Sequence, residues 1–168
     1  MFGDWNGASK QGVNDIERFE NLLQSKVNQE LKEVDLYEGV KELLAELNKQ
    51  GKKIVLVASS TRRYIEPAMK KHGIYEIFDL ILDGNDVKNH KPDPEVILKA
   101  IELLKTDKDN TILMGDSKSD LGAAQAAQID SILFYPESHK IYYDKDFLLR
   151  FNPNYVIKSI IEAQKLLL

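Results

Sequence analysis

The chain has 168 residues, a formal net charge of −4, 43% hydrophobic and 30% charged residues, and no cysteine. These values suit one globular domain and exclude global disorder, disulfides, thiolate zinc sites and thiol nucleophiles. The longest apolar run is residues 54–58, far short of the roughly 20 that a membrane helix needs, and no basic start leads into an apolar stretch as in a signal peptide. Because the charges are scattered, no basic stripe suggests nucleic-acid binding. We therefore expect a cytoplasmic α/β domain that binds neither membrane nor nucleic acid.

The N-terminal part of the chain is predicted to be helical after an irregular start. Residues 1–12 contain three glycines and no periodicity, which indicates a loop. Apolar residues at helical spacing predict an amphipathic helix over 15–34 and a second one from Val40 onward. Gly51 would end the second helix, because a glycine suits the left-handed position that follows a helix.

Beyond Gly51, short apolar runs alternate with helical patterns. The predicted strands are residues 54–58, 78–82, 111–114 and 131–134. The predicted helices are 61–72, capped by the residues 59–61, then 94–104, a segment rich in Ala and Gln after residue 114, and a last helix from about Val156 or Lys158. Residues 135–152 are expected to form a polar and aromatic loop. This alternation predicts a Rossmann-like, doubly wound parallel sheet.

The functional site of such a sheet lies at the carboxyl ends of its strands. After the strand 111–114, Gly115 allows a sharp turn, and Asp116 and Asp120 follow four residues apart at a helix start. Two carboxylates at this spacing can meet on one side of the helix and suit Mg²⁺, which takes a few carboxylates together with water and phosphate. The alternative is that Asp120 completes a capping box that begins at Ser117.

Other polar residues at the strand ends could bind an anion. Ser59 and Ser60 end the first predicted strand and precede a helix, where hydroxyls and free N–H groups bind phosphate or merely cap the helix. Lys91 lies in a turn stiffened by two prolines, which would aim its ammonium at a phosphate or leave it as a solvated charge. The histidines show no metal-ligand spacing, and His139 is expected to pack or hydrogen-bond within its loop.

Four segments in this order form a recognisable set. They are residues 36–44 (LYEGVKELL), 54–60, 91–94 (KPDP) and 115–117 (GDS) with Asp120. Together they resemble the haloacid dehalogenase (HAD) superfamily of phosphohydrolases, near the phosphoglycolate phosphatase and β-phosphoglucomutase branch, over residues 36–160.

The resemblance implies a Mg²⁺-dependent phosphatase that acts on a small phosphorylated metabolite through an aspartyl-phosphate. Asp116 and Asp120 would hold the metal, and Lys91 would neutralise charge. The family's phosphate-binding Ser or Thr aligns with Ala58, so Ser59, Ser60 or backbone N–H groups would replace it. Alternatives are a phosphosugar mutase, or a chain without a nucleophile that only binds phosphate or a partner.

The family's nucleophile motif, Asp-x-Asp after an apolar strand, does not occur ahead of Tyr37. Asp4, with Asn6 in place of the acid/base, is a partial match, although only three residues precede it. The preferred interpretation makes residues 1–36 a loop plus the remnant of a helical cap, and residues 37–168 a HAD-like core that lacks its first strand.

The missing strand would leave a gap in the middle of the sheet. Unpaired backbone groups there cost about 1–3 kcal/mol each, and an open strand edge favours pairing with another chain. We therefore expect either re-pairing of the sheet or strand exchange with a partner segment or a second copy in a homo-oligomer.

Overall fold

The computed structural model describes Leu22, Ser25, Lys26 and all residues from Val34 to Leu168. The three isolated positions are helical, in agreement with the helix predicted over 15–34. The rest of that helix, the loop predicted over 1–12 and the candidate nucleophile Asp4 lie outside the described residues.

Eleven helices and strands and three short 3₁₀ turns make up the part of the chain from Val34 onward. The helices are α3 (Val40–Lys49), α4 (Arg62–Lys71), α5 (Glu95–Leu104), α6 (Lys118–Ala127), α7 (Lys145–Leu149) and α8 (Ile160–Leu167). The strands are β1 (Val55–Val57), β2 (Leu80–Leu82), β3 (Ile112–Gly115), β4 (Asp130–Phe134) and β5 (Tyr155–Ile157). The 3₁₀ turns are Tyr75–Ile77, Gly84–Asp86 and Glu137–Ile141.

The strands and helices predicted between Val40 and Phe134 are confirmed, but the C-terminal part differs. The segment 135–152 is not only loop, because it contains α7. The last helix begins at Ile160 rather than at Val156 or Lys158, since residues 155–157 form β5 and Ser159 caps α8 by accepting the N–H of Glu162. The apolar residues Val156 and Ile157 stand directly before the apolar pattern of α8, so the sequence did not separate this strand from the start of the helix.

All strand pairs are parallel, as predicted, but the described strands form two sheets rather than one. β1 pairs with β2, and β3, β4 and β5 form a three-stranded sheet in that order. Within the described part of the chain, β1 and β3 are each paired on one side only. The re-pairing of the sheet that we considered would have closed the gap, and these two strands do not show it.

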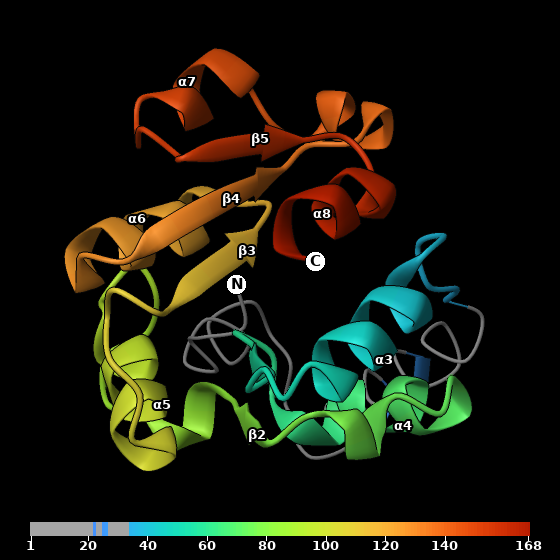
Figure 1. Cartoon of the computed structure of the whole chain (residues 1–168). Helices are drawn as coiled ribbons and strands as arrows, with labels where there is room; N and C mark the ends of the chain where they lie inside the picture. The colour runs from blue at the N-terminus through green and yellow to red at the C-terminus, as the bar shows by residue number, and fades with distance from the viewer. Residues whose placement is uncertain (1–21, 23–24, 27–33) are drawn as a thin grey trace.

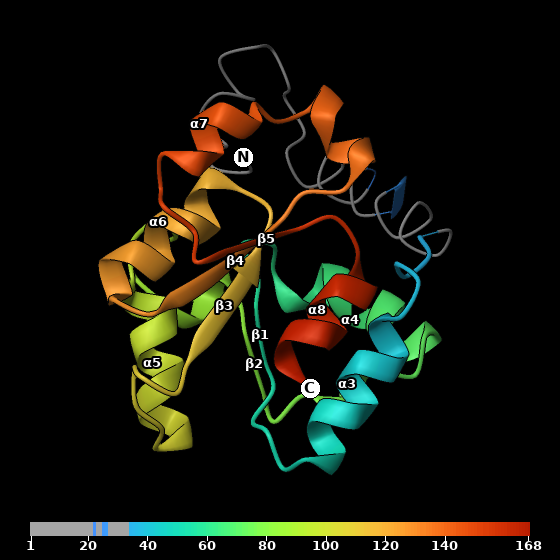
Figure 2. The same cartoon turned by 45° about the horizontal axis from the view of Figure 1, so that its top comes forward.

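Helices cover both faces of the two sheets, with α5 and α6 on one side and α3, α4 and α8 on the other (Figures 1 and 2). One buried cluster joins the two sheets: Leu82 of β2 packs with Val96 and Ile97 of α5 and Ala123 of α6, against Val57 and Leu113. On the other face, Leu43 of α3 packs with β4, β5 and α8, while Leu44 of the same helix packs against the cluster around β1 and β2. The helices therefore hold the two sheets together.

Among the residues placed by the structure, no helix combines the length and apolar character that crossing a bilayer requires.

Candidate functional site

The loop after β3 and the first turn of α6 form a compact polar unit. Ser117 is the residue before α6, and its Oγ accepts the N–H of Asp120 at 3.3 Å. In return, Asp120 Oδ2 accepts the Ser117 hydroxyl at 2.6 Å and the Ser117 N–H at 3.2 Å. The capping box considered from the sequence is thus present, and it fixes the direction of the Asp120 side chain.

Gly115, the last residue of β3, is required by the close approach of Asp120. A Cβ added at this glycine would lie 2.3 Å from the Cβ of Asp120 and 2.6 Å from its Cγ. Non-bonded carbon atoms do not approach one another this closely, so any side chain at position 115 would displace Asp120.

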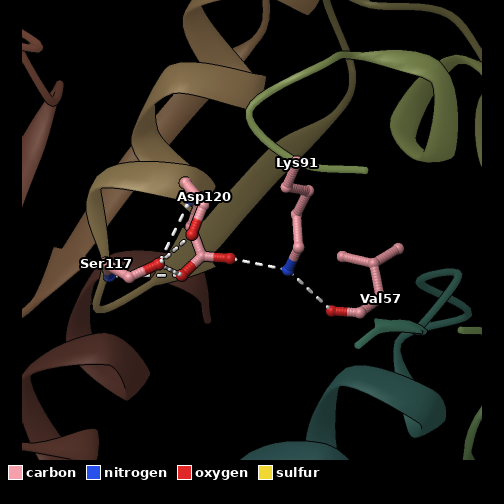
Figure 3. A network of polar contacts seen from close by, with 5 residues as sticks. Val57, Lys91, Ser117 and Asp120 are labelled. Atoms are coloured by element: carbon pink, nitrogen blue, oxygen red, sulfur yellow. Dashed lines mark hydrogen bonds and ion pairs between the residues drawn. The ribbon is translucent and has the colours of Figure 1, made fainter. Parts of the chain in front are cut away.

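Lys91 links the two sheets at their carboxyl ends (Figure 3). Its Nζ donates to Asp120 Oδ1 at 2.7 Å and to the backbone oxygen of Val57 in β1 at 3.1 Å. The side chain is only 8% exposed. The loop that carries it packs closely on α6, because a Cβ at Gly122 would lie 2.8 Å from Cβ of Pro92. The structure therefore brings Lys91 and Asp120, both predicted as site residues, into contact at the gap between β1 and β3.

The pKa values of the two aspartates are shifted in opposite directions. Burial opposes the ionisation of Asp120, but the Lys91 ammonium and the hydrogen bonds from Ser117 hold its pKa below the ordinary value. Burial and the negative charge of Asp120 raise the pKa of Asp116, against smaller opposing effects of His139 and Lys91. Asp116 is thus the carboxylate whose charge is less well compensated.

His139 lies beside Asp116, a contact that the sequence did not reveal. It belongs to the 3₁₀ turn after β4, and its Nδ1 is 3.6 Å from Asp116 Oδ2. On its other side, Nε2 is 3.1 Å from the hydroxyl of Tyr37. The expectation that His139 packs and hydrogen-bonds is confirmed, but its partner Tyr37 is 102 positions away rather than in the same loop. The one sequence signal that could have pointed to His139 as a site residue is its place in the segment that follows the strand β4.

Ser59 and Ser60 are exposed at the end of β1 and precede α4. The residue directly before α4 is Thr61, whose side chain makes no capping hydrogen bond. The predicted cap by residues 59–61 is therefore wrong: the first helical N–H, that of Arg62, donates to Oδ2 of the buried Asp83 instead. Asp83 follows β2, and the sequence pointed to residues 83–91 as a strand end without assigning Asp83 this capping role. The role of Ser59 and Ser60 in phosphate binding stays a prediction.

The fit to a divalent cation rests on Asp116 and Asp120. Among the residues that the structure describes, no group of three or more His, Cys, Asp or Glu side chains gathers as a complete metal-ligand set. Mg²⁺ does not need one, because it commonly takes one or two carboxylates and completes its octahedron with water and phosphate. The half-buried Asp116 carboxylate, with its raised pKa, suits a cation that would compensate its charge, so the residues fit Mg²⁺.

Comparison with known proteins identifies the family. The family model for haloacid dehalogenase-like hydrolases matches residues 5–134. The pyrophosphatase PpaX of Halalkalibacterium halodurans is 35% identical over 128 residues, which are 76% of this chain but only 57% of that protein. The chain thus spans little more than half the length of this relative.

Solved structures share the fold. A β-phosphoglucomutase candidate from Thermotoga maritima matches with a TM-score of 0.80 at 24% identity, over 96% of this chain and 76% of that one. The HAD-hydrolase candidate YfnB from Bacillus subtilis, solved bound to magnesium, matches with a TM-score of 0.67 at 22% identity, over 79% of this chain and 55% of that one. Because the family model covers more than half of the chain, this protein belongs to the haloacid dehalogenase-like hydrolases.

Proposed function

We propose that this chain is a Mg²⁺-dependent phosphomonoester hydrolase that acts on a small phosphorylated metabolite. The observation that supports the proposal is the convergence of Lys91, Asp116 and Asp120 at the carboxyl ends of β1 and β3. Family membership and the magnesium bound to the related YfnB structure support the choice of reaction and metal.

Each of these side chains has a distinct task in the proposal. Asp116 and Asp120 hold Mg²⁺, which when bound polarises a phosphoryl oxygen. Lys91 supplies a nearly buried positive charge that offsets the charge of the phosphoryl group and of Asp120. Ser59 and Ser60 offer exposed hydroxyls at the end of β1 to the phosphoryl oxygens.

The covalent step requires a carboxylate that attacks phosphorus while the bond to the leaving oxygen breaks, followed by hydrolysis of the aspartyl-phosphate by water. Asp4, by its partial match to the family's motif, is the less favoured candidate for this carboxylate. In the interpretation that we prefer, residues 1–36 instead comprise a loop and a remnant of the helical cap, which precede the α/β core of residues 37–168.

Two substrates deserve a direct comparison. The likeness to PpaX makes pyrophosphate a candidate beside phosphomonoesters. A phosphosugar mutase remains the less favoured variant, supported by the fold likeness to the Thermotoga maritima structure alone.

A second candidate function is that of a protein that binds phosphate or a partner without turnover. The observation that favours it is the absence of Asp-x-Asp ahead of Tyr37 in the sequence. Such a protein would retain Lys91, Asp116 and Asp120 as a binding site.

The test is the release of inorganic phosphate from p-nitrophenyl phosphate and from pyrophosphate, with Mg²⁺ and with EDTA. We expect Mg²⁺-dependent hydrolysis whose kcat/KM falls at least about 100-fold in Asp116→Asn, equal to about 2.7 kcal/mol. Asp109→Asn is the matched control, because it makes the same chemical change at an exposed position before β3.

Two results would decide against the enzyme. Hydrolysis that persists in EDTA and in Asp116→Asn contradicts the proposed site. Wild-type protein that binds Mg²⁺ and phosphate but releases no product favours the second candidate. If hydrolysis occurs, its loss in Asp4→Asn identifies the nucleophile, and full activity of that variant excludes Asp4.

A further inference from the structure

The imidazole of His139 lies between two polar groups from distant parts of the chain. Nε2 is 3.1 Å from Tyr37 Oη, and Nδ1 is 3.6 Å from Asp116 Oδ2. The His139 side chain is 13% exposed, whereas that of Asp116 is 40% exposed. Nδ1 itself is fully buried and has no hydrogen-bond partner among the described residues. A buried polar nitrogen of this kind usually has a hydrogen-bond partner, and the Asp116 carboxylate at 3.6 Å is an acceptor that could fill this role.

Aromatic rings hold the imidazole in place. The rings of Phe134 and Tyr143 lie 5.7 Å from it, centre to centre, at angles of 75° and 59°. The Tyr37 ring packs edge-on against Phe134 at 4.9 Å. His139 is thus packed among aromatic rings beyond the end of β4, next to the candidate metal ligand Asp116.

We propose that His139 is a positioning residue, which orients the Asp116 carboxylate toward the divalent cation while the Tyr37 hydroxyl fixes the imidazole tautomer. The inference rests on the proposed function, because it assigns Asp116 as a metal ligand. It concerns how the ligand is held: carboxylates and imidazoles that bind metals are commonly oriented by hydrogen bonds from an outer layer of residues.

The chemistry of the three groups determines which atom donates in the Tyr37–His139 hydrogen bond, and which would donate across the 3.6 Å contact between His139 and Asp116. An ionised carboxylate only accepts, so the imidazole must carry its proton on Nδ1 to stabilise Asp116. In that neutral tautomer Nε2 is an acceptor, and the Tyr37 hydroxyl is then the donor. The direction of donation runs from Tyr37 through His139 to Asp116. The charges of Asp120 and Lys91 also act on Asp116, and His139 is the group whose Nδ1 lies 3.6 Å from its Oδ2.

The first experiment examines the tautomer in the metal-free full chain by long-range ¹H–¹⁵N NMR of the imidazole. We expect an imidazole proton on Nδ1, and a shift of the proton toward Nε2 in Asp116→Ala and in Tyr37→Phe. The second substitution keeps the packing of the Tyr37 ring and removes only its hydroxyl. A wild-type chain with the proton predominantly on Nε2 overturns the proposal.

The second experiment measures Mn²⁺ affinity by isothermal titration calorimetry. In His139→Asn the side-chain amide can reproduce the donor at Nδ1, whereas in His139→Gln it reaches the position of Nε2 and the donor at Nδ1 is lost. We expect His139→Gln to weaken Mn²⁺ binding by about 10-fold or more, and His139→Asn to stay much closer to wild type. Thermal unfolding of both variants verifies that each is folded.

The outcomes separate this inference from the proposed function. Equal Mn²⁺ affinity of wild type and His139→Gln, or equal weakening in His139→Asn and His139→Gln, overturns the role of His139 alone. A wild-type chain that binds no Mn²⁺ overturns the metal site of the proposed function and the role of His139 with it.

Discussion

Lys91 and Asp120 illustrate how strongly the value of an ion pair depends on its surroundings. Their side chains are 8% and 13% exposed, and the pair also satisfies the backbone oxygen of Val57. Lys53 and Asp79 are joined by the same 2.7 Å distance, but the Lys53 side chain is 59% exposed. Removal of one partner leaves an uncompensated buried charge only in the first pair.

We therefore predict that Lys91→Met lowers the free energy of unfolding by about 3–5 kcal/mol, whereas Lys53→Met lowers it by at most about 1 kcal/mol. Urea unfolding of the two variants and wild type measures the difference. Equal losses in both variants would contradict the account of the buried pair.

The pH dependence of stability follows from the direction of the Asp120 shift. Lys91 and Ser117 hold the pKa of folded Asp120 below its unfolded value, so its stabilising contribution is complete above about pH 4 and is lost as the pH falls through the lowered folded pKa. The difference in unfolding free energy between wild type and Asp120→Asn should thus shrink as the pH falls below about 4. A difference that stays constant from pH 6 to the acid limit of folding would show that the Asp120 charge is not stabilised by folding.

At the scale of elements, the start of α6 serves both the helix and the site. Ser117 caps the helix and simultaneously holds Asp120 through two hydrogen bonds to Oδ2. Ser159 caps α8 in a comparable way, by accepting the N–H of Glu162 at 3.3 Å. The two caps differ in that only the first one supports a proposed metal ligand.

Both Ser117→Ala and Ser159→Ala should lower stability by about 1 kcal/mol, because each removes a helix cap. Only Ser117→Ala should also weaken Mn²⁺ binding, since only this change removes a hydrogen bond to the Asp120 carboxylate. Calorimetric titration of the two variants tests the distinction, and unchanged affinity in Ser117→Ala would separate the cap from the site.

The sequence was sufficient for elements with a strong pattern and for residues at strand ends. The run at 54–58, the helix start near Glu95, and the loop with Asp116 and Asp120 were all located correctly because each has local signals. The strand β5 was missed because its apolar residues stand directly before the apolar pattern of α8, and because only its pairing with β4 in the folded chain defines it as a strand. The Tyr37–His139 contact and the Asp83 cap could not be predicted, since they join segments far apart in the chain.

At the scale of the whole molecule, two parallel sheets lie edge to edge, with β1 and β3 as the strands on either side of the gap (Figure 1). Backbone groups of Ile54 and Ala58 bond to the β2 side. Because neighbouring residues of a strand point their backbone groups to opposite sides, Val55 and Val57 face the gap. Lys91 satisfies the Val57 oxygen. We propose that a strand from a partner segment or a second copy pairs with the remaining groups.

Amide hydrogen exchange and light scattering test this assembly. Slow exchange of the Val55 and Val57 amides is expected, because a strand in the gap would bond them, and a dimeric mass would identify a second copy as its source. A strictly monomeric protein whose Val55 and Val57 amides exchange rapidly would contradict the proposal.

The most direct test of the central claim is a crystal structure of the full chain grown with Mn²⁺ and phosphate, with the metal located by its anomalous signal. We predict a single strong peak at bonding distance from the Asp116 carboxylate, with Asp120 in its coordination sphere directly or through water, and phosphate within hydrogen-bond reach of Lys91. A metal peak elsewhere, or phosphate bound away from Lys91, would contradict the assignment of this site.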